Sequence, residues 1–259
     1  MAFLDFGPSD RPVDLVFLHA NGFNALTYRR ILAQLAGGAR ILAPDLRGHG
    51  RTDLATITEG RVSWHDLRDD LLAFMTALDL TGVVLGGHSM GATTSLLAAA
   101  EAPGRVRALA LFDPVIGPGP APASEPRTAV HGDLIAGAGR RRRTFPSRAA
   151  AFEAYRGRGA FRGWPEAMLA DYVADGFRDA SGGGVELACD PAWEASSYAS
   201  HGHDSWEAFE RSAAPIRIWR AAEGSTFRPD RREAALTASG RVTVETIPGT
   251  SHFLPMERP

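Results

Sequence analysis

Short apolar segments alternate along the chain with longer stretches in which apolar residues recur at helical spacing. Most of the short segments are continuously apolar, as expected for strands covered by helices on both faces. They lie at residues 14–20, 40–45, 82–87, 106–113, 216–221 and 241–247. Between them, the amphipathic stretches 25–36, 64–78 and 90–102 predict helices. The alternation predicts the α/β class, with a doubly wound and mostly parallel sheet.

The alternation breaks after residue 113 and resumes only at 216. The segment between them starts with GPGPAPASEP at 117–126, which is typical of a loop. It continues with helical patterns at 147–157 and 165–177, and it is too long to be a plain connection. We therefore expect an inserted, mainly helical cap. The predicted division is a core of residues 1–113 and 206–259 with a cap of residues 114–205.

The composition narrows the class of protein without defining its function. A length of 259 residues suits one large α/β domain or two small ones. The formal net charge of −2 argues against a nucleic-acid partner, and all 28 basic residues are Arg. The single cysteine, Cys189, excludes an internal disulfide. The N-terminus has no signal-peptide pattern and no run reaches the ~20 apolar residues of a membrane helix, so we expect a cytoplasmic protein without a membrane partner.

The segment VVLGGHSMGATTSLLAAA, at 83–100, places Ser89 between an expected strand and an expected helix. Residues 87–91, GHSMG, fit the G-x-S-x-G pattern of a nucleophile elbow, and the strand and helix on either side are the context that this motif requires. The flanking glycines allow a sharp turn that raises the serine Oγ above the sheet. A serine that only caps a helix is the alternative interpretation. A dinucleotide-binding loop is disfavoured, because the G-x-G-x-x-G spacing is missing.

With this segment the chain resembles the α/β-hydrolase superfamily. LHANGF at 18–23 resembles the family's oxyanion loop, and PDLRGHGRT at 44–52 resembles its D-x-R-G-H-G loop. GTSHFLPMERP at 249–259 resembles its catalytic-histidine segment. The resemblance implies the α/β-hydrolase fold for the expected core and leaves out the expected cap. It also implies a final helix after His252, whereas the sequence continues for seven residues.

The resemblance identifies His252 as the catalytic base, because it follows the last strand and comes after Ser89 in the chain. A neutral imidazole at this place can take the serine proton and later give it to the leaving group. His88 is the direct neighbour of Ser89 in the turn, so we expect it to pack away from the Oγ.

Several other polar residues are interpreted as structural. His201 and His203 lie in SHGHDS, where no further ligands occur at zinc spacing, so a polar loop is favoured over a metal site. The residues expected to tie down the loops near the site are His19, His49, Asp45 and Arg47.

The acid is the member that the family pattern does not place. Its usual position, in the loop after strand 216–220, falls on Gly224. Glu223 is one residue away, and a slip of one residue at a strand end turns a side chain to the other face. Asp113 ends the strand at 106–112, at the carboxyl edge of the sheet, and some relatives resemble this arrangement. Asp113 is therefore preferred over Glu223, although an Asp before proline is also common in turns.

The oxyanion site requires two backbone N–H donors. The first is expected at Met90, directly after the nucleophile and at a helix N-terminus. The second is expected at Asn21, by analogy with the family's His-Gly-X motif. This chain has Ala20 where the family has glycine, which leaves a shift of the loop by one residue open.

Two further groups of residues have both a functional and a structural interpretation. The run Arg140–Arg143 can attract an anion, but a solvated helix end is favoured. Four aromatic residues can line an apolar acyl pocket, although any one of them is more often core: Phe23, Trp164, Trp193 and Trp206.

Together these features predict a serine hydrolase without cofactor or metal, with Ser89, His252 and Asp113 as its triad. A carboxylesterase of small molecules, working through an acyl-enzyme, requires least beyond this machinery. C–C hydrolases, lactonases, thioesterases, perhydrolases and hydroxynitrile lyases use the same constellation. Haloalkane dehalogenases and epoxide hydrolases resemble this fold but carry Asp at the position of Ser89, which disfavours them. A non-catalytic binding receptor is the alternative outside enzymology, and no feature of the sequence defines an oligomeric state.

Overall fold

The protein is built on a central sheet of seven strands, over the residues that its computed structural model describes, 1–117 and 128–259. The strand order is β1-β3-β2-β4-β5-β9-β10, and β1 alone runs antiparallel to its neighbour. This confirms the α/β class and the mostly parallel sheet. The strands are β1 (Phe3–Phe6), β2 (Leu15–Leu18), β3 (Ile41–Pro44), β4 (Val83–His88), β5 (Val106–Phe112), β9 (Ile216–Ala221) and β10 (Val242–Ile247).

Six of these strands lie where the apolar segments predict them, and β1 was not predicted. Its sequence, FLDF, is short and alternates between exposed and half-buried residues at the edge of the sheet. Such a strand carries too weak a pattern to separate from a loop.

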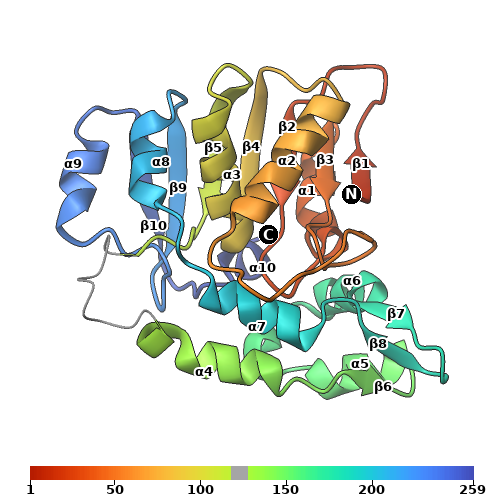
Figure 1. Cartoon of the computed structure of the whole chain (residues 1–259). Coiled ribbons are helices and arrows are strands. Elements are labelled where there is room, and N and C mark those ends of the chain that lie inside the picture. The colour runs from red at the N-terminus through yellow and green to blue at the C-terminus, as the bar shows by residue number, and fades with distance from the viewer. Residues whose placement is uncertain (118–127) are drawn as a thin grey trace.

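Helices cover both faces of the sheet, as Figure 1 shows. In β2, Val16 and Leu18 pack into the apolar cluster beneath α2, α3 and α8, whereas Leu15 and Phe17 join the cluster on the opposite face with Tyr28. A strand buried in this way on both faces must be apolar throughout, which explains the continuous apolar segments. The helices of the core are α1 (Arg29–Leu35), α2 (His65–Ala77), α3 (Met90–Glu101), α8 (Ser205–Arg211), α9 (Glu233–Thr237) and α10 (Leu254–Glu257), with 3₁₀ turns η1 (Ala25–Tyr28) and η3 (Asp230–Arg232).

The elements between β5 and α8 lie together beyond the carboxyl ends of the strands, at the bottom of Figure 1. We call residues 128–200 the cap segment. Most of the loop predicted at 117–126 lies outside the described residues. The helices of the cap segment are α4 (Thr128–Gly139), α5 (Arg148–Tyr155), α6 (Glu166–Gly176) and α7 (Pro191–Ala199), with the 3₁₀ turn η2 (Gly159–Phe161).

The expectation of a mainly helical cap needs one correction, because the cap segment also contains a small antiparallel sheet. Its strands are β6 (Thr144–Phe145), β7 (Phe177–Asp179) and β8 (Val185–Leu187), in the order β6-β8-β7. Strands of two or three residues are too short to show the alternation by which strands are recognised in a sequence.

Helix α6 attaches the cap segment to the core through two carboxylates on one face. Asp171 forms ion pairs with Arg29 and with Arg30, and Asp175 pairs with Arg51 at 2.7 Å. Residues four apart lie on the same side of a helix, so both carboxylates meet the core together. The side chains of both aspartates are almost completely buried, whereas those of their arginine partners remain partly exposed. The attachment is therefore ionic and only partly shielded from water.

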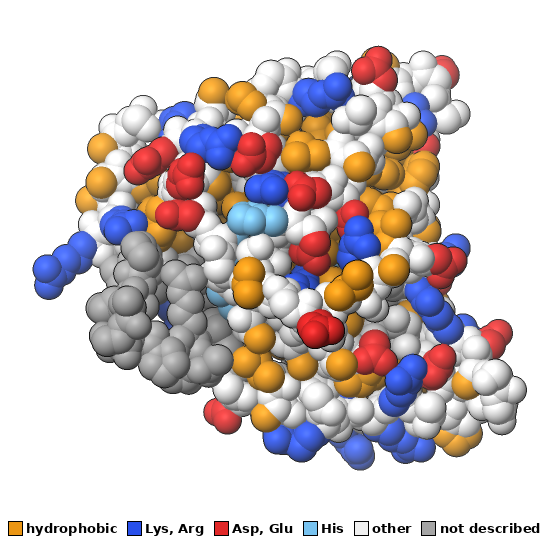
Figure 2. All heavy atoms as spheres, viewed as in Figure 1, with side chains coloured by type: hydrophobic (Ala, Val, Ile, Leu, Met, Phe, Trp, Pro, Cys, Tyr) orange, Lys and Arg blue, Asp and Glu red, His pale blue; other side chains and the backbone are white. Residues whose placement is uncertain are grey.

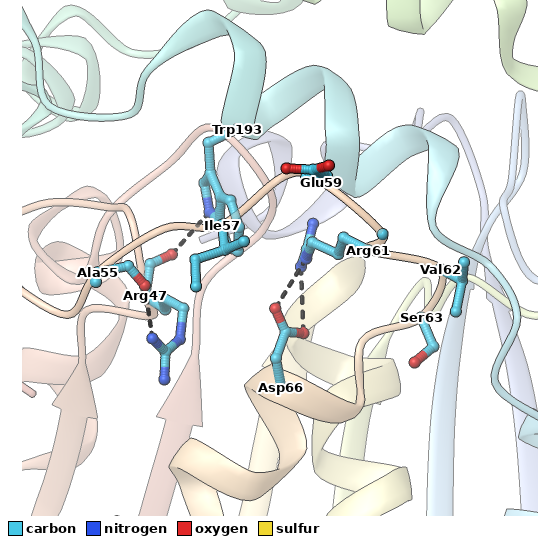
Figure 3. Close-up of a pocket in the computed structure, with 10 residues that line it drawn as sticks. Arg47, Ala55, Ile57, Glu59, Arg61, Val62, Ser63, Asp66 and Trp193 are labelled. Atoms are coloured by element: carbon cyan, nitrogen blue, oxygen red, sulfur yellow. Dashed lines mark hydrogen bonds and ion pairs between the residues drawn. The ribbon is translucent and has the colours of Figure 1, made fainter.

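Helix α7 makes a second attachment through Arg61, shown in Figure 3. The Arg61 guanidinium lies 4.0 Å from the centre of the Trp193 ring, pairs with Asp66 at 2.8 Å and donates to Ser197 Oγ at 2.8 Å. The adjoining hollow, about 390 Å³, also contains the exposed side chain of Ile57. Because Arg61 is paired with Asp66 and Arg47 with Asp70, we interpret it as a junction between the loop and α7.

On the face in Figure 2, acidic and basic side chains are interspersed rather than gathered into one patch. None of the helices in the described part of the chain is long and apolar enough to cross a bilayer.

Candidate active site

Ser89 stands in a tight turn between β4 and α3, as the motif predicts. Its backbone has φ 55° and ψ −119°, which is a strained conformation for a residue with a side chain. A Cβ on Gly87 would lie 2.6 Å from the backbone of Gly91, and one on Gly91 would lie 2.4 Å from the carbonyl oxygen of Leu18. Only glycine fits at both positions, so the two glycines of the motif are needed to close the turn.

The structure brings the three predicted residues Ser89, His252 and Asp113 together. His252 Nε2 lies 3.0 Å from Ser89 Oγ, and His252 Nδ1 lies 2.6 Å from Asp113 Oδ2. The three residues follow β4, β10 and β5, so the ends of three parallel strands position them. A proton can therefore move between the serine and the imidazole while the carboxylate holds the opposite nitrogen.

Asp113 is completely buried and its carboxylate is held by several donors. Oδ1 accepts hydrogen bonds from the Ala221 N–H at 3.0 Å and the Ser225 hydroxyl at 2.5 Å, and Oδ2 accepts one from the Thr226 N–H at 2.9 Å. Burial opposes ionisation, but the hydrogen bonds from His252, Ser225 and the Ala221 N–H outweigh it and lower the pKa of Asp113. The group is therefore ionised at neutral pH.

Glu223 lies apart from this arrangement. Its side chain is exposed, and its backbone N–H donates to the Thr250 carbonyl at 3.0 Å. The β9–η3 loop (residues 222–229), where the family pattern expects the acid, instead supplies the Ser225 and Thr226 donors that surround Asp113. Neither residue was predicted from the sequence; the pair of hydroxyl residues directly after Gly224 is the signal that can identify them.

Several backbone N–H groups of the β2–η1 loop (residues 19–24) are engaged in hydrogen bonds that fix the loop. The Ala20 N–H donates to the Tyr28 hydroxyl at 3.2 Å, the Gly22 N–H to His49 Nε2 at 3.0 Å, and the Phe23 N–H to the Ala20 carbonyl at 3.1 Å. In the described part of the chain, neither the Asn21 N–H nor the Met90 N–H has an acceptor. Both residues line the same cavity as Ser89.

Two histidines tie the β2–η1 loop to the following loop, as predicted. His19 donates from Nδ1 to the Ala20 carbonyl at 2.8 Å and accepts the Leu46 N–H on Nε2 at 2.9 Å. His49 accepts the Gly22 N–H and donates to the Arg47 carbonyl. Burial lowers the pKa of both histidines, so each stays neutral and keeps one donor and one acceptor.

Asp45 and Arg47 also have the structural roles that the sequence predicts. Asp45 accepts hydrogen bonds from the backbone N–H groups of Ala25 and Arg51 at 2.8 and 2.9 Å. Arg47 pairs with Asp70 of α2 at 2.6 Å.

A cavity of about 560 Å³ opens on Ser89 between the core and the cap segment. Its walls are mostly apolar and aromatic, and of the four aromatic residues proposed to line a pocket only Phe23 does so. The three tryptophans do not line it, and Trp164 and Trp193 are buried, as the favoured interpretation of such residues as core expects. Trp164 packs against Phe23 in the core, Trp193 donates to the Arg47 carbonyl, and Trp206 donates to the Gly117 carbonyl. The aromatic residues of the wall are Phe23, Trp64, Tyr155, Phe161, Tyr172, Tyr198 and Phe253.

The run Arg140–Arg143 is not simply a solvated helix end, because Arg141 turns inward to the cavity wall. It forms an ion pair with the buried Glu194 and donates to the Tyr172 hydroxyl at 2.7 Å. Arg143 forms surface pairs with Glu186 and Asp190. The favoured interpretation is therefore wrong for Arg141, because partners distant in the sequence satisfy its charge.

The two histidines of SHGHDS lie against the indole of Trp64, with ring centroids 4.9 Å (His201) and 4.7 Å (His203) away. No group of three or more His, Cys, Asp or Glu residues suited to a metal occurs among the residues that the structure describes.

The seven-stranded sheet and the turn at Ser89 have the architecture of the α/β-hydrolase fold, and the sequence agrees with this assignment. A profile of the Alpha/beta hydrolase family matches residues 15–259. The chain belongs to this family.

Individual relatives match over shorter regions. Haloalkane dehalogenase of Agrobacterium fabrum is 37% identical over 105 residues, or 39% of this chain and 33% of that protein. 2-(Acetamidomethylene)succinate hydrolase of Mesorhizobium japonicum is 30% identical over 99 residues, or 38% of this chain and 34% of that protein. The chain thus spans about a third of the length of these curated relatives.

Solved structures resemble the protein over nearly its whole length. E-2-(Acetamidomethylene)succinate hydrolase has a TM-score of 0.78 at 22% identity, covering 99% of this chain and 90% of that chain. A thioesterase domain from the curacin biosynthetic pathway has a TM-score of 0.77 at 20% identity, covering 98% and 90%. At such identities the likeness supports the fold and carries no information about the substrate.

Proposed function

We propose that the protein is a serine hydrolase that cleaves a carboxylic ester of a small molecule through an acyl-enzyme. The observation that carries the proposal is the continuous contact from Ser89 Oγ through His252 to Asp113, at 3.0 and 2.6 Å, at the floor of an apolar cavity. Asp113 accepts the Nδ1 proton of His252, which leaves the Nε2 lone pair directed at the serine hydroxyl.

The reaction follows from this tautomer. His252 takes the proton as Ser89 Oγ attacks the ester carbonyl, and Asp113 stabilises the imidazolium that forms. The Asn21 and Met90 N–H groups, which have no acceptor in the described part of the chain, donate to the developing oxyanion. His252 then protonates the leaving alcohol, and a water molecule activated by the same imidazole releases the acid.

Dehalogenation is disfavoured despite the similarity to haloalkane dehalogenase. A serine oxygen that displaces a halide forms an alkyl ether, which has no carbonyl for water to attack. A carboxylate nucleophile forms an ester in the same step, and an ester can be hydrolysed. Ser89 therefore suits acyl transfer and not alkyl transfer.

C–C hydrolysis, thioester cleavage and lactone opening use the same groups and are the alternative activities. We favour an ester because it needs no group beyond those described. The cap, residues 114–205, is proposed to set the substrate range, since its aromatic residues form much of the cavity wall.

The test compares the wild type with Ser89→Ala and with Ser95→Ala. Ser95 is a buried serine on α3, the helix that follows Ser89, and its hydroxyl donates to the Gly86 carbonyl. A fluorophosphonate probe and p-nitrophenyl esters of graded acyl length, with a thioester, a lactone and a C–C substrate beside them, measure activation of the serine and the bond cleaved. We expect Ser89→Ala to lose labelling and about 10⁴-fold or more in turnover, while Ser95→Ala keeps both. Retention of a tenth of the turnover by Ser89→Ala excludes it as the nucleophile, and a wild type that never labels supports the binding receptor.

A further inference from the structure

His88, the residue before Ser89, is held at both ring nitrogens inside the protein. It is completely buried, Nδ1 lies 2.7 Å from the Tyr28 hydroxyl, and Nε2 lies 2.7 Å from the backbone carbonyl oxygen of His252. The sequence suggests only packing for this side chain. The observed contacts connect it to the loop that carries His252.

The direction of each hydrogen bond follows from the donors available. The Ala20 N–H donates to the Tyr28 oxygen at 3.2 Å, so the single proton of the hydroxyl is free to go to His88 Nδ1. His88 Nε2 must then carry the ring proton and donate it to the His252 carbonyl. Burial, aided by the nearby His252, lowers the pKa of His88 to about 3, so the ring stays neutral and this pattern persists at neutral pH.

We propose that His88 and Tyr28 are positioning residues, which hold the loop of the base and the loop of the Asn21 oxyanion donor in one fixed relation. The proposal rests on the function proposed above. The chain of contacts runs from the β2–η1 loop at Ala20 to the β10–α10 loop (residues 248–253) at His252, through side chains that water does not reach.

Each end of this series of contacts has a consequence for catalysis. At one end, fixing the Ala20 N–H on Tyr28 orients the loop in which the next N–H, that of Asn21, is left without an acceptor among the described residues. At the other end, the His252 backbone is fixed while Asp113 fixes its ring, so the Nε2 position is set from two sides. The rings of His88 and His252 are 5.0 Å apart, and a neutral His88 adds no repulsion when His252 becomes charged.

The variants separate this role from general packing. Tyr28→Phe removes only the hydroxyl, His88→Leu removes both ring contacts, and His88→Gln restores an amide donor that can reach the His252 carbonyl. Phe209→Leu, at a buried site in the cluster beneath α8 on the other face of the sheet, is the control for loss of stability alone. Each variant is assayed for kcat, KM, fluorophosphonate labelling and Tm.

We expect Tyr28→Phe and His88→Leu to lower kcat and labelling by about 10- to 100-fold, as sub-ångström to 1 Å displacements of catalytic groups do, with KM within about twofold. The double variant should lose no more kcat than the worse single variant, because both substitutions interrupt the same series of hydrogen bonds. His88→Gln should recover part of the loss, and Phe209→Leu should lower Tm without lowering kcat. Losses that match Phe209→Leu, or that add in the double variant, overturn the proposal.

A readout that does not require turnover separates this inference from the proposed function. The proton between His252 Nδ1 and Asp113 is expected to give a downfield signal in the ¹H NMR spectrum, because it lies in a short, buried hydrogen bond. This signal should shift or broaden in Tyr28→Phe and stay unchanged in Phe209→Leu. If the wild type cleaves no ester but the signal responds in this way, the positioning role stands and the proposed function fails. An unchanged signal in Tyr28→Phe, with unchanged kcat, excludes the positioning role.

Discussion

Replacing Asp113 with Asn removes a charge while preserving the shape of the side chain, which makes it the sharpest test of the proposed triad. The native carboxylate accepts the Ala221 N–H and Ser225 hydroxyl on one oxygen, and the Thr226 N–H and His252 Nδ1–H on the other. An amide has one acceptor oxygen and one NH₂ donor, so it cannot satisfy both sides.

Each of the two amide orientations has a defined cost. With NH₂ toward His252, the imidazole must accept on Nδ1 and carry its proton on Nε2, where it can no longer take the proton of Ser89. With NH₂ toward Ala221, the base tautomer survives but the buried Ala221 N–H loses its acceptor. In each orientation one buried backbone N–H loses its hydrogen bond, that of Thr226 in the first and that of Ala221 in the second. Such a loss costs about 1–3 kcal/mol of stability. Both orientations also remove the charge that stabilises the imidazolium.

We therefore expect Asp113→Asn to fold, to unfold at lower urea concentration, and to lose about 10⁴-fold in kcat, equivalent to about 5.4 kcal/mol in the activation barrier. Ester turnover, phosphonate labelling and urea unfolding followed by circular dichroism measure the three effects. Glu223→Gln is the matched control, since it makes the same chemical change at an exposed residue and should leave kcat within about twofold. Retention of more than a tenth of kcat by Asp113→Asn refutes the reasoning, and a large loss in Glu223→Gln moves the acid to that residue.

Two further predictions concern stability. Because burial lowers the pKa of His88 to about 3, the unfolded chain gains a proton there below about pH 6.5 that the folded protein does not bind. Stability is thus fully present above that pH and falls toward acid by roughly 1.4 kcal/mol per pH unit from this residue. His88→Gln should show a shallower fall between pH 6.5 and 4.5 in urea unfolding, and identical slopes would contradict the neutral state of His88. Gly91→Ala should cost about 1–3 kcal/mol or more, since the added Cβ meets the carbonyls of Leu18 and His19 at 2.4 and 2.5 Å. Gly104→Ala, where no atom lies within 4 Å, should cost little; equal midpoints for the two variants would rule out the close approach.

The strands and the turn at Ser89 can be predicted from the sequence, because each depends on a local pattern of residues. The buried parallel strands show as continuous apolar segments, and the turn at Ser89 shows in the glycines at 87 and 91, because both the strand burial and the close approach act on adjacent residues. The proximity of Asp113 to His252 is predictable from the rule that parallel strands bring their carboxyl ends to one edge. Gly224 then excludes the usual position of the acid.

Other contacts between residues distant in the sequence leave no such signal. Arg141 belongs to a run of four arginines, and nothing in that run distinguishes the one that meets Glu194, which lies 53 residues away. The contact between Tyr28 and His88 joins residues 60 positions apart. The short strands of the cap segment carry too few residues for a period. In each case the tertiary packing determines which residues meet, and the neighbouring residues in the sequence do not.

The single thiol of the protein offers a direct way to observe movement of the cap segment. Cys189 lies just before α7, is 4% exposed and belongs to the same apolar cluster as Leu46 and Trp64 of the core. Burial raises the pKa of its thiol well above the ordinary range, so the closed protein holds it protonated and out of reach of alkylating reagents. Since the chain has no other cysteine, its rate of alkylation measures how often α7 separates from the core, and binding of a molecule that holds the cavity closed should slow that rate without any engineered label.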